Sequence, residues 1–210
     1  MPVTGVQTCA LPISLSTVTA NQTVLNAINN YEVQNLLRLD DYLFSPDNNS
    51  SYAQNDNLET RGATTQLLRY ALDLSAGTNN SLLHSLVNSQ TIGIVNFNAV
   101  FAATFPDIFT AVQQQVIANF MANSGIATDV KYAFPSWNYR DIIGNGLDKK
   151  INPLTTKSLI PGSNAAFSIT GGGAGYARFR VGLNTTGTVT STSAGGAVPA
   201  SVQLILIRSQ

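Results

Sequence analysis

The sequence predicts an α+β fold in which a helical unit is followed by a separate, small antiparallel β-sheet or sandwich. Two observations support this prediction. The spacing of apolar residues changes near Thr156 from about 3.6, the period of a helix, to about 2, the period of a strand. The charge changes nearby: 11 acidic and 5 basic residues lie up to Asp148, whereas six basic and no acidic residues follow it. We therefore expect a helical domain over 15–148 and a β domain over 149–210.

Residues 1–14 are expected to be an unstructured artefact. The string GVQTCALPI at 5–13 is identical with the translation of a common sequencing-library adapter. The stretch has no lysine or arginine, so it lacks the basic start of a secretory signal. The only cysteine, Cys9, lies inside it, and the remaining chain therefore offers no disulfide, thiolate ligand or thiol nucleophile. We expect the natural protein to continue upstream of Leu15.

Composition narrows the classes of partner. Charged residues make up only 10% of the chain, while Asn, Ser and Thr are abundant, a composition typical of exported bacterial proteins. No run of 18 apolar residues is present, so the sequence predicts no membrane span. The six bases after Asp148 are scattered, whereas nucleic-acid binding needs bases clustered among aromatic residues, which argues against a nucleic-acid partner.

The first expected helix covers 20–44, with Asn21 or Thr19 as its cap, because apolar residues recur there at helical spacing. The polar stretch 45–56 is rich in turn-forming residues and predicts a loop. Its Asp and Asn residues resemble calcium-loop chemistry only superficially, because the regular alternation and the final glutamate of such a loop are missing.

The rest of the chain is organised around a helix over 58–73. Asp56 and Glu59 have the spacing of a capping box, and Gly77 is expected to end the helix. Gly62 costs about 1 kcal/mol relative to alanine inside a helix, so another segment is expected to pack closely against it. The apolar face is formed by residues three or four positions apart: Leu58, Gly62, Thr65, Leu68 and Leu72, widened by Leu67 and Ala71.

Two arginines of this helix admit different interpretations. Arg61 and Arg69 are either solvent-exposed or ion-paired, with Asp73 one turn from Arg69 as its partner, or else they anchor the structure or contact substrate.

Further helices are expected over 80–87 and from Pro106 to Gly125. Between them we expect a turn or short extended link over 90–96, with Gly93 at its centre, and one helical turn over 98–103. His84, the only histidine, is interpreted as a surface or packing residue rather than a metal ligand. The segment 131–144 has four aromatic residues within eight positions, Tyr132, Phe134, Trp137 and Tyr139. This cluster either stacks a sugar or clamps a peptide, or it buries a returning loop against the helices.

Strands are expected over 157–160, 165–170, 175–182, 186–192 and 201–208, separated by turn-forming residues. The glycines at 171–173 form a turn and not a phosphate loop, because no helix follows and no lysine is suitably placed. Catalytic motifs are missing as well. A zinc-binding H-E-x-x-H needs two histidines, no G-x-S-x-G elbow occurs, and only two glutamates, Glu32 and Glu59, are present.

Several stretches, in order, resemble secreted bacterial zinc metallopeptidases, the hyicolysin-like members of the gluzincin group. They are ETRGATTQLLRYALD, a short Leu-rich helix, TIGIVNFNA, a helix ending in VIANFMANSG, and YAFPSWNYRDI. The similarity is close over about 20–145 and loose over 156–210. It implies that the helices form the lower half of a catalytic domain, and that the tail corresponds to a β domain appended to exported peptidases. The family pattern has a tryptophan near 64–66 and another near 114–115, where this chain has none.

In that family an upstream helix carries H-E-x-x-H, and a later glutamate completes the zinc site. Neither has a counterpart here, so the resemblance implies that zinc and the catalytic base belong to an upstream segment of the same chain. The sequence thus predicts the non-catalytic C-terminal portion of a secreted or cell-surface peptidase that acts on peptides. Arg61, Arg69, Trp137 and Asn138 are its candidate structural or substrate-contact residues. The alternative is a non-catalytic cell-surface module that binds glycan or protein, with Trp137 or Tyr176 as stacking platform.

Overall fold

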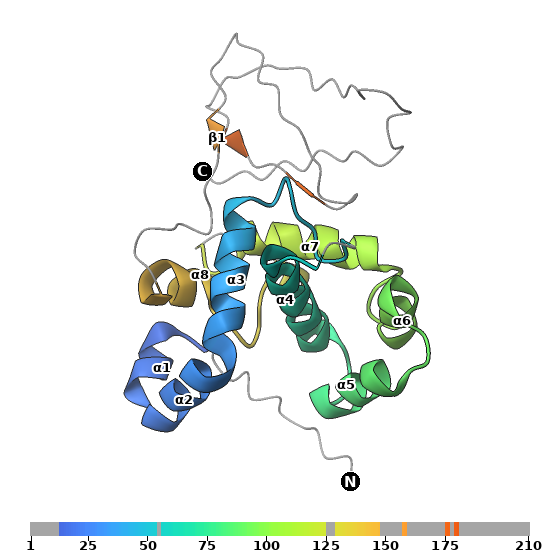
Figure 1. The fold of residues 1–210 in the computed structure, drawn as a ribbon, viewed down its shortest axis with the longest axis horizontal. Coiled ribbons are helices and arrows are strands. Elements are labelled where there is room, and N and C mark those ends of the chain that lie inside the picture. The colour runs from blue at the N-terminus through green and yellow to red at the C-terminus, as the bar shows by residue number, and fades with distance from the viewer. Residues whose placement is uncertain are drawn as a thin grey trace.

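The computed structural model describes residues 13–53, 56–124 and 129–147, together with 157–158, 175–176 and 179–180. The described chain is mainly helical, with α3 and α4 crossing at its centre and α7 lying across them (Figure 1). Helices α1, α2 and α8 lie on one side of this crossing, and α5 and α6 lie on the other. The helical elements are α1 (Leu15–Ala20), α2 (Gln22–Ala27), the π-helical η1 (Ile28–Glu32), α3 (Val33–Phe44), α4 (Leu58–Leu74), α5 (Asn79–Asn88), α6 (Gly93–Val100), α7 (Ile108–Met121), η2 (Val130–Tyr132), α8 (Tyr139–Asp141) and the π-helical η3 (Ile142–Leu147).

The predicted α+β fold class with an antiparallel sheet or sandwich is wrong. The strands that the structure describes are β1 (Lys157–Ser158) and β2 (Phe179–Arg180), each two residues long, and they pair in parallel. Alternating apolar and polar residues show which side chains share a face of a strand. In a stretch rich in Gly, Ser and Thr, few apolar side chains are present to fix the direction and register of strand pairing, so the alternation predicts these only weakly. The strands predicted over 165–170, 186–192 and 201–208 lie outside the described residues.

Helices α3 and α4 pack backbone to backbone at Gly62. A Cβ atom built on Gly62 would lie 2.3 Å from the carbonyl carbon of Arg38 and 2.4 Å from the amide nitrogen of Leu39. No side chain fits at that distance, so glycine is required for the crossing. The prediction of a close approach at Gly62 is confirmed, and the approach explains why a poor helix former stands there.

Buried amides join α4 to α7. Gln66 and Gln115 are almost completely buried, and the Gln115 Nε2 atom donates to Gln66 Oε1 at 2.8 Å. Gln66 Nε2 donates to Asn119 Oδ1 at 2.7 Å, and Asn119 Nδ2 donates back to Gln66 Oε1 at 3.1 Å. Because buried polar groups are costly unless they are paired, this cluster favours one register of α4 against α7.

The helix starts correct some predictions and confirm others. Asn21 caps α2, as expected, by accepting from the amides of Thr23 and Val24. The cap of α4 is Asn57 and not Asp56: its side chain accepts from the Thr60 amide at 2.7 Å, while Asp56 binds Arg61. The link expected around Gly93 is instead the start of α6, where Gly93 has a φ of +61°.

The first described residues lie against the region before α8. Ile13 forms a parallel bridge with Trp137: its amide donates to the Ser136 carbonyl at 2.9 Å, and its carbonyl accepts from the Asn138 amide at 2.8 Å. Ser14 caps α1. The assignment of residues 1–14 to an artefact stays a prediction. Residues 1–12 lie outside the described residues.

Candidate functional site

A polar contact near the aromatic cluster joins α4 to residues 133–138, which we call the return loop. One carboxylate oxygen of Asp73, Oδ2, accepts from the amide of Ser136 at 3.1 Å and from its hydroxyl at 2.5 Å. The other, Oδ1, accepts from Arg69 Nε at 2.7 Å. A single carboxylate near the end of α4 therefore bridges a helix and a loop that are 63 residues apart in sequence.

The ion pair at the centre of this contact is largely removed from water. The Asp73 side chain is only 2% exposed, and the Arg69 side chain is 25% exposed. Buried charges are tolerated only when they are paired and hydrogen-bonded, and both Asp73 oxygens are. The predicted pairing of Arg69 with Asp73 is confirmed, and the geometry gives Arg69 the role of a structural anchor.

Six aromatic rings form a continuous chain of contacts from α6 to α8. Successive centroid distances are 6.5 Å for Phe97–Phe105, 6.0 Å for Phe105–Tyr70, 5.6 Å for Tyr70–Phe134, 5.0 Å for Phe134–Tyr139 and 5.9 Å for Tyr139–Trp137. Tyr70 stands in the middle, and its hydroxyl donates to the Lys131 carbonyl. Such contacts stabilise beyond the area they bury, so this chain of rings fixes the return loop on α4.

Trp137 and Asn138 lie where the return loop meets the first described residues. The Trp137 ring is half-buried and stacks on Tyr139 with an interplanar angle of 13°. Asn138 caps α8 by accepting from the Asp141 amide at 3.1 Å. Trp137 and Asn138 therefore hold the return loop together. One face of the Trp137 ring is covered by the ring of Tyr139.

Both central tyrosines are held in the neutral form. Burial raises the pKa of Tyr139, and the negative charge of Asp73 raises it further. Burial also raises the pKa of Tyr70. These phenols carry no negative charge at neutral pH, so Tyr139 acts as a packing group, and Tyr70 as a packing group and a hydrogen-bond donor, rather than as bases.

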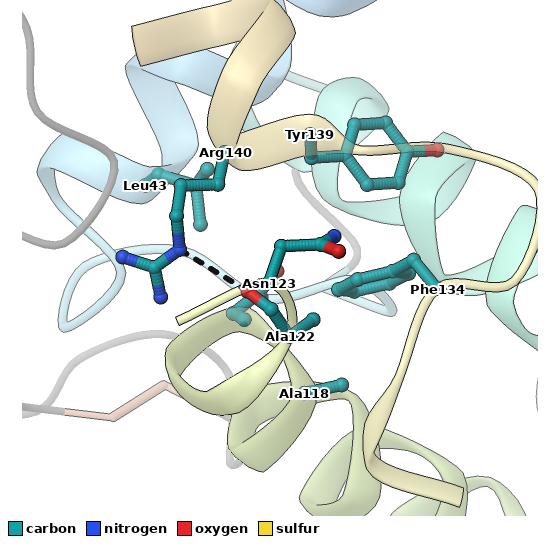
Figure 2. A pocket seen from close by; sticks show the side chains of 8 residues that line it. Leu43, Ala118, Ala122, Asn123, Phe134, Tyr139 and Arg140 are labelled. Carbon is teal, nitrogen blue, oxygen red and sulfur yellow. Dashed lines mark hydrogen bonds between the residues drawn. The ribbon is translucent and has the colours of Figure 1, made fainter. Parts of the chain in front are cut away.

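A small cavity of about 10 Å³, enough for about one water molecule, lies between α3, α7 and α8. Figure 2 shows Arg140 and Tyr139 above it and Ala118 and Ala122 below. Arg140 Nε donates to the Ala122 carbonyl at 3.1 Å, and Arg140 Nη2 donates to the Phe120 carbonyl at 2.6 Å. A cation on the last carbonyls of a helix satisfies groups that α7 leaves unpaired.

The sequence did not indicate Arg140, Ser136 or the pair of Gln66 and Gln115. Their contacts span 18 to 63 residues, and local spacing carries no signal for such partners. The aromatic density of 131–144 was the one available signal for this region, and it located the right segment without its polar contacts.

Arg61 is not part of this cluster. It lies in the first turn of α4, where Arg61 Nε donates to Asp56 Oδ1 at 2.7 Å. Its side chain is 48% exposed and that of Asp56 is 76% exposed. The hydrogen bond from Arg61 lowers the pKa of Asp56. Exposed pairs of this kind add little to stability.

The described residues do not fit a zinc site. They contain no group of three or more His, Cys, Asp or Glu side chains close enough to hold a metal ion. His84, the single histidine of the sequence, lies exposed on α5. Among the helices that the structure describes, none combines the length and hydropathy needed to cross a membrane.

Comparison of the chain with protein-family models, with curated proteins and with solved structures found no match in any of the three.

Proposed function

We propose that this chain is the non-catalytic helical portion of a secreted or cell-surface zinc metallopeptidase-like protein, and that it forms one wall of the substrate cleft. In this proposal zinc and the general base belong to an upstream segment, which is the main partner of the helices described above, and peptide is the substrate. No step of the reaction is assigned to residues of this chain, because the described residues do not fit a metal.

One observation carries the proposal: the stretches on which the resemblance rests pack against one another. The chain of aromatic rings passes through Tyr70 of the first stretch, Phe97 of TIGIVNFNA and Phe134 of the last stretch. Arg140 of the last stretch binds carbonyls of VIANFMANSG at the end of α7, and Asn96 of TIGIVNFNA donates to the Leu86 carbonyl of the Leu-rich helix. Segments that resemble parts of one domain would have to be neighbours in space, and here they are.

The departures from the family pattern also meet in space. Tryptophan is missing near 64–66 and near 114–115, and in those places Gln66 and Gln115 form a buried hydrogen bond of 2.8 Å. In this proposal, one buried amide pair takes the place of two aromatic residues. Because the two positions are in contact, we interpret the two missing tryptophans as a single, coupled difference from the family pattern.

The proposal assigns different roles to the candidate residues. Arg69, Trp137 and Asn138 keep the wall rigid through the contacts of the return loop. Arg61, half-exposed at the start of α4, is the candidate for contact with substrate.

Peptide hydrolysis by the chain alone and by the protein extended upstream tests this proposal. We expect the chain alone to release no products from a casein or mixed-peptide substrate with or without zinc. We expect the extended protein to cleave it, to lose activity with a chelator and to regain activity with zinc. In the extended protein, Arg61→Ala should raise KM, whereas Lys131→Ala, another exposed cation, should not. Zinc-independent cleavage, or cleavage by the chain alone, would contradict the proposal.

The alternative function is a module that binds glycan or protein by stacking on Trp137, the only tryptophan in the sequence, whose side chain is only half-buried. Tyr176, the other platform considered, is less suitable, because its ring packs edge-on against Tyr42 at 6.3 Å. Titration of the chain with soluble oligosaccharides, followed by tryptophan emission, distinguishes the two functions. A saturable change in emission would favour the alternative, and an unchanged spectrum is expected for the peptidase wall.

A further inference from the structure

The end of η3 carries an asparagine that is followed by glycine. Asn145 and Gly146 form the only Asn-Gly pair in the sequence. Both residues are exposed, and they lie just before Leu147, the last residue of η3. Helix ends open more readily than helix centres, so the backbone at this pair can leave its helical conformation while in contact with water. This is the setting in which an asparagine side chain reacts with the main chain beside it.

Gly146 leaves the main-chain nitrogen next to Asn145 without a side chain to shield it. Glycine has no Cβ atom, and it reaches backbone conformations that other residues avoid. Space on one side of Gly146 is limited, because a Cβ atom built there would lie 3.0 Å from the Cδ1 atom of Leu15. A side chain at position 146 would therefore both shield the nitrogen and press on the flexible end of Leu15.

Asp141 connects Asn145 to the start of α1. The Oδ2 atom of Asp141 accepts from the Leu15 amide at 2.7 Å, and its Oδ1 atom accepts from Asn145 Nδ2 at 3.0 Å. The neutral amide of Asn145 thus donates to the carboxylate that holds Leu15. An ionised acid at position 145 has no proton to donate, and it carries the same charge as Asp141 four residues away. Conversion of this amide to an acid would therefore weaken the hold on Leu15.

We propose that Asn145 is a site of spontaneous deamidation, and that this modification loosens the start of α1. The Gly146 nitrogen, after losing its proton to a base in solution, attacks the Cγ atom of Asn145. The new C–N bond closes a five-membered succinimide, and the Cγ–Nδ2 bond breaks as the side-chain nitrogen takes up a proton and leaves as ammonia. Water then opens the ring at one of its two carbonyls, which gives aspartate or isoaspartate. Water is the only co-reactant, and nothing is oxidised or reduced.

The two products differ from asparagine in ways that η3 tolerates poorly. Both remove the Nδ2 donor to Asp141 and add a negative charge within about one turn of it. Negative charge is also unfavourable near the end of a helix, because it opposes the helix dipole. Isoaspartate in addition adds one carbon atom to the main chain and so interrupts the helical repeat. The reaction requires only these residues and water, and it does not depend on a peptidase function.

Peptide mass spectrometry of the full chain, incubated for weeks at mildly alkaline pH, tests the modification. We expect the peptide with Asn145 to gain about one dalton several-fold faster than the peptide with Asn88. Asn88 is the matched comparison, because it is exposed at the end of α5 but is followed by Ser89. Gly146→Ala should slow the gain at Asn145, because a side chain then shields the nitrogen. Equal rates at Asn145 and Asn88, or no gain at Asn145, would overturn the proposal.

Hydrogen exchange of the Leu15 amide, measured by NMR on the full chain, tests the effect of the modification. Asn145→Asp reproduces one product, and we expect it to make the exchange at Leu15 several-fold faster, because the amide is released more often from Asp141. Asn88→Asp is the control: it adds the same charge at the end of α5, on the side of the molecule opposite α8 (Figure 1), and should leave this exchange unchanged. Equal exchange in the two variants would overturn the proposed loosening of α1.

Discussion

Gly62 shows how one residue determines the packing of two helices. Replacing glycine by alanine in an unobstructed helix stabilises it by about 1 kcal/mol, but the added Cβ would lie 2.3 to 2.4 Å from three backbone atoms of α3. Backbone atoms cannot move aside as a side chain can, so the clash outweighs the gain. We expect Gly62→Ala to lower the free energy of unfolding by about 2–3 kcal/mol, measured by urea denaturation. An unchanged or higher stability would show that α3 and α4 do not cross at this residue.

Asp73 is the residue on which the return loop depends most. Asp73→Asn removes the charge opposite Arg69, whose side chain is 25% exposed and can partly reach water. We therefore expect a loss of about 2–3 kcal/mol, somewhat below that for a completely buried pair. In a double-mutant cycle with Arg69→Met, the combined loss should be clearly smaller than the sum of the single losses. Strict additivity would mean that the two side chains do not interact.

Tyr139 makes stability depend on alkaline pH. Burial raises its pKa in the folded state, so the folded chain keeps the proton when the unfolded chain loses it above pH of about 10. Its contribution is complete below that pH and is lost as the pH rises, with a slope of about 1.4 kcal/mol per pH unit. Tyr139→Phe should reduce the slope by this amount, in denaturation measured from pH 8 to 11, and leave the contribution of Tyr70, whose pKa burial also raises. Trp137→Phe is the control, because it changes a neighbouring ring without removing a titrating group. Its free energy of unfolding should fall with pH at the same slope as that of the unaltered chain.

At the level of the elements, the start of α4 distinguishes two neighbouring polar residues. The Asn57 side chain accepts from the Thr60 amide and also donates to Asn49 Oδ1 at 2.9 Å. Asn57→Ala should therefore cost about 1–2 kcal/mol, in the upper range for a lost cap. Asp56→Ala breaks only an exposed pair and should cause little measurable change. Equal effects in thermal denaturation, or the reverse order, would contradict this cap assignment.

Contacts within one helix and the need for a close approach were predictable from the sequence, whereas the partners of distant contacts were not. The pairing of Arg69 with Asp73 and the close approach at Gly62 follow from helical spacing and from the cost of glycine. The cap of α4 was misplaced by one residue because Asp56 and Asn57 are both good caps, and only the contact with Arg61 separates them. The start of α6 was missed because Ile92, its cap position, offers no capping side chain.

For the molecule as a whole, periodicity identified the longer helices but misjudged the fold class. Helices form from contacts three or four residues apart, so their pattern is visible in any window of sequence. A sheet needs pairing between distant strands, and the described pair, Lys157 with Phe179 and Ser158 with Arg180, is parallel and short. The aromatic segment at 131–144 located the candidate site, whereas the bonds from Ser136 to Asp73 depend on the fold.

The central claim is that these helices are the wall of a peptidase whose zinc site lies upstream. The most direct test is the genomic coding sequence preceding Leu15, obtained by amplification across the junction with residues 1–14. The account predicts an open reading frame with an H-E-x-x-H helix, followed by a glutamate, before the helices described above. A stop codon or an unrelated domain in that place would contradict it.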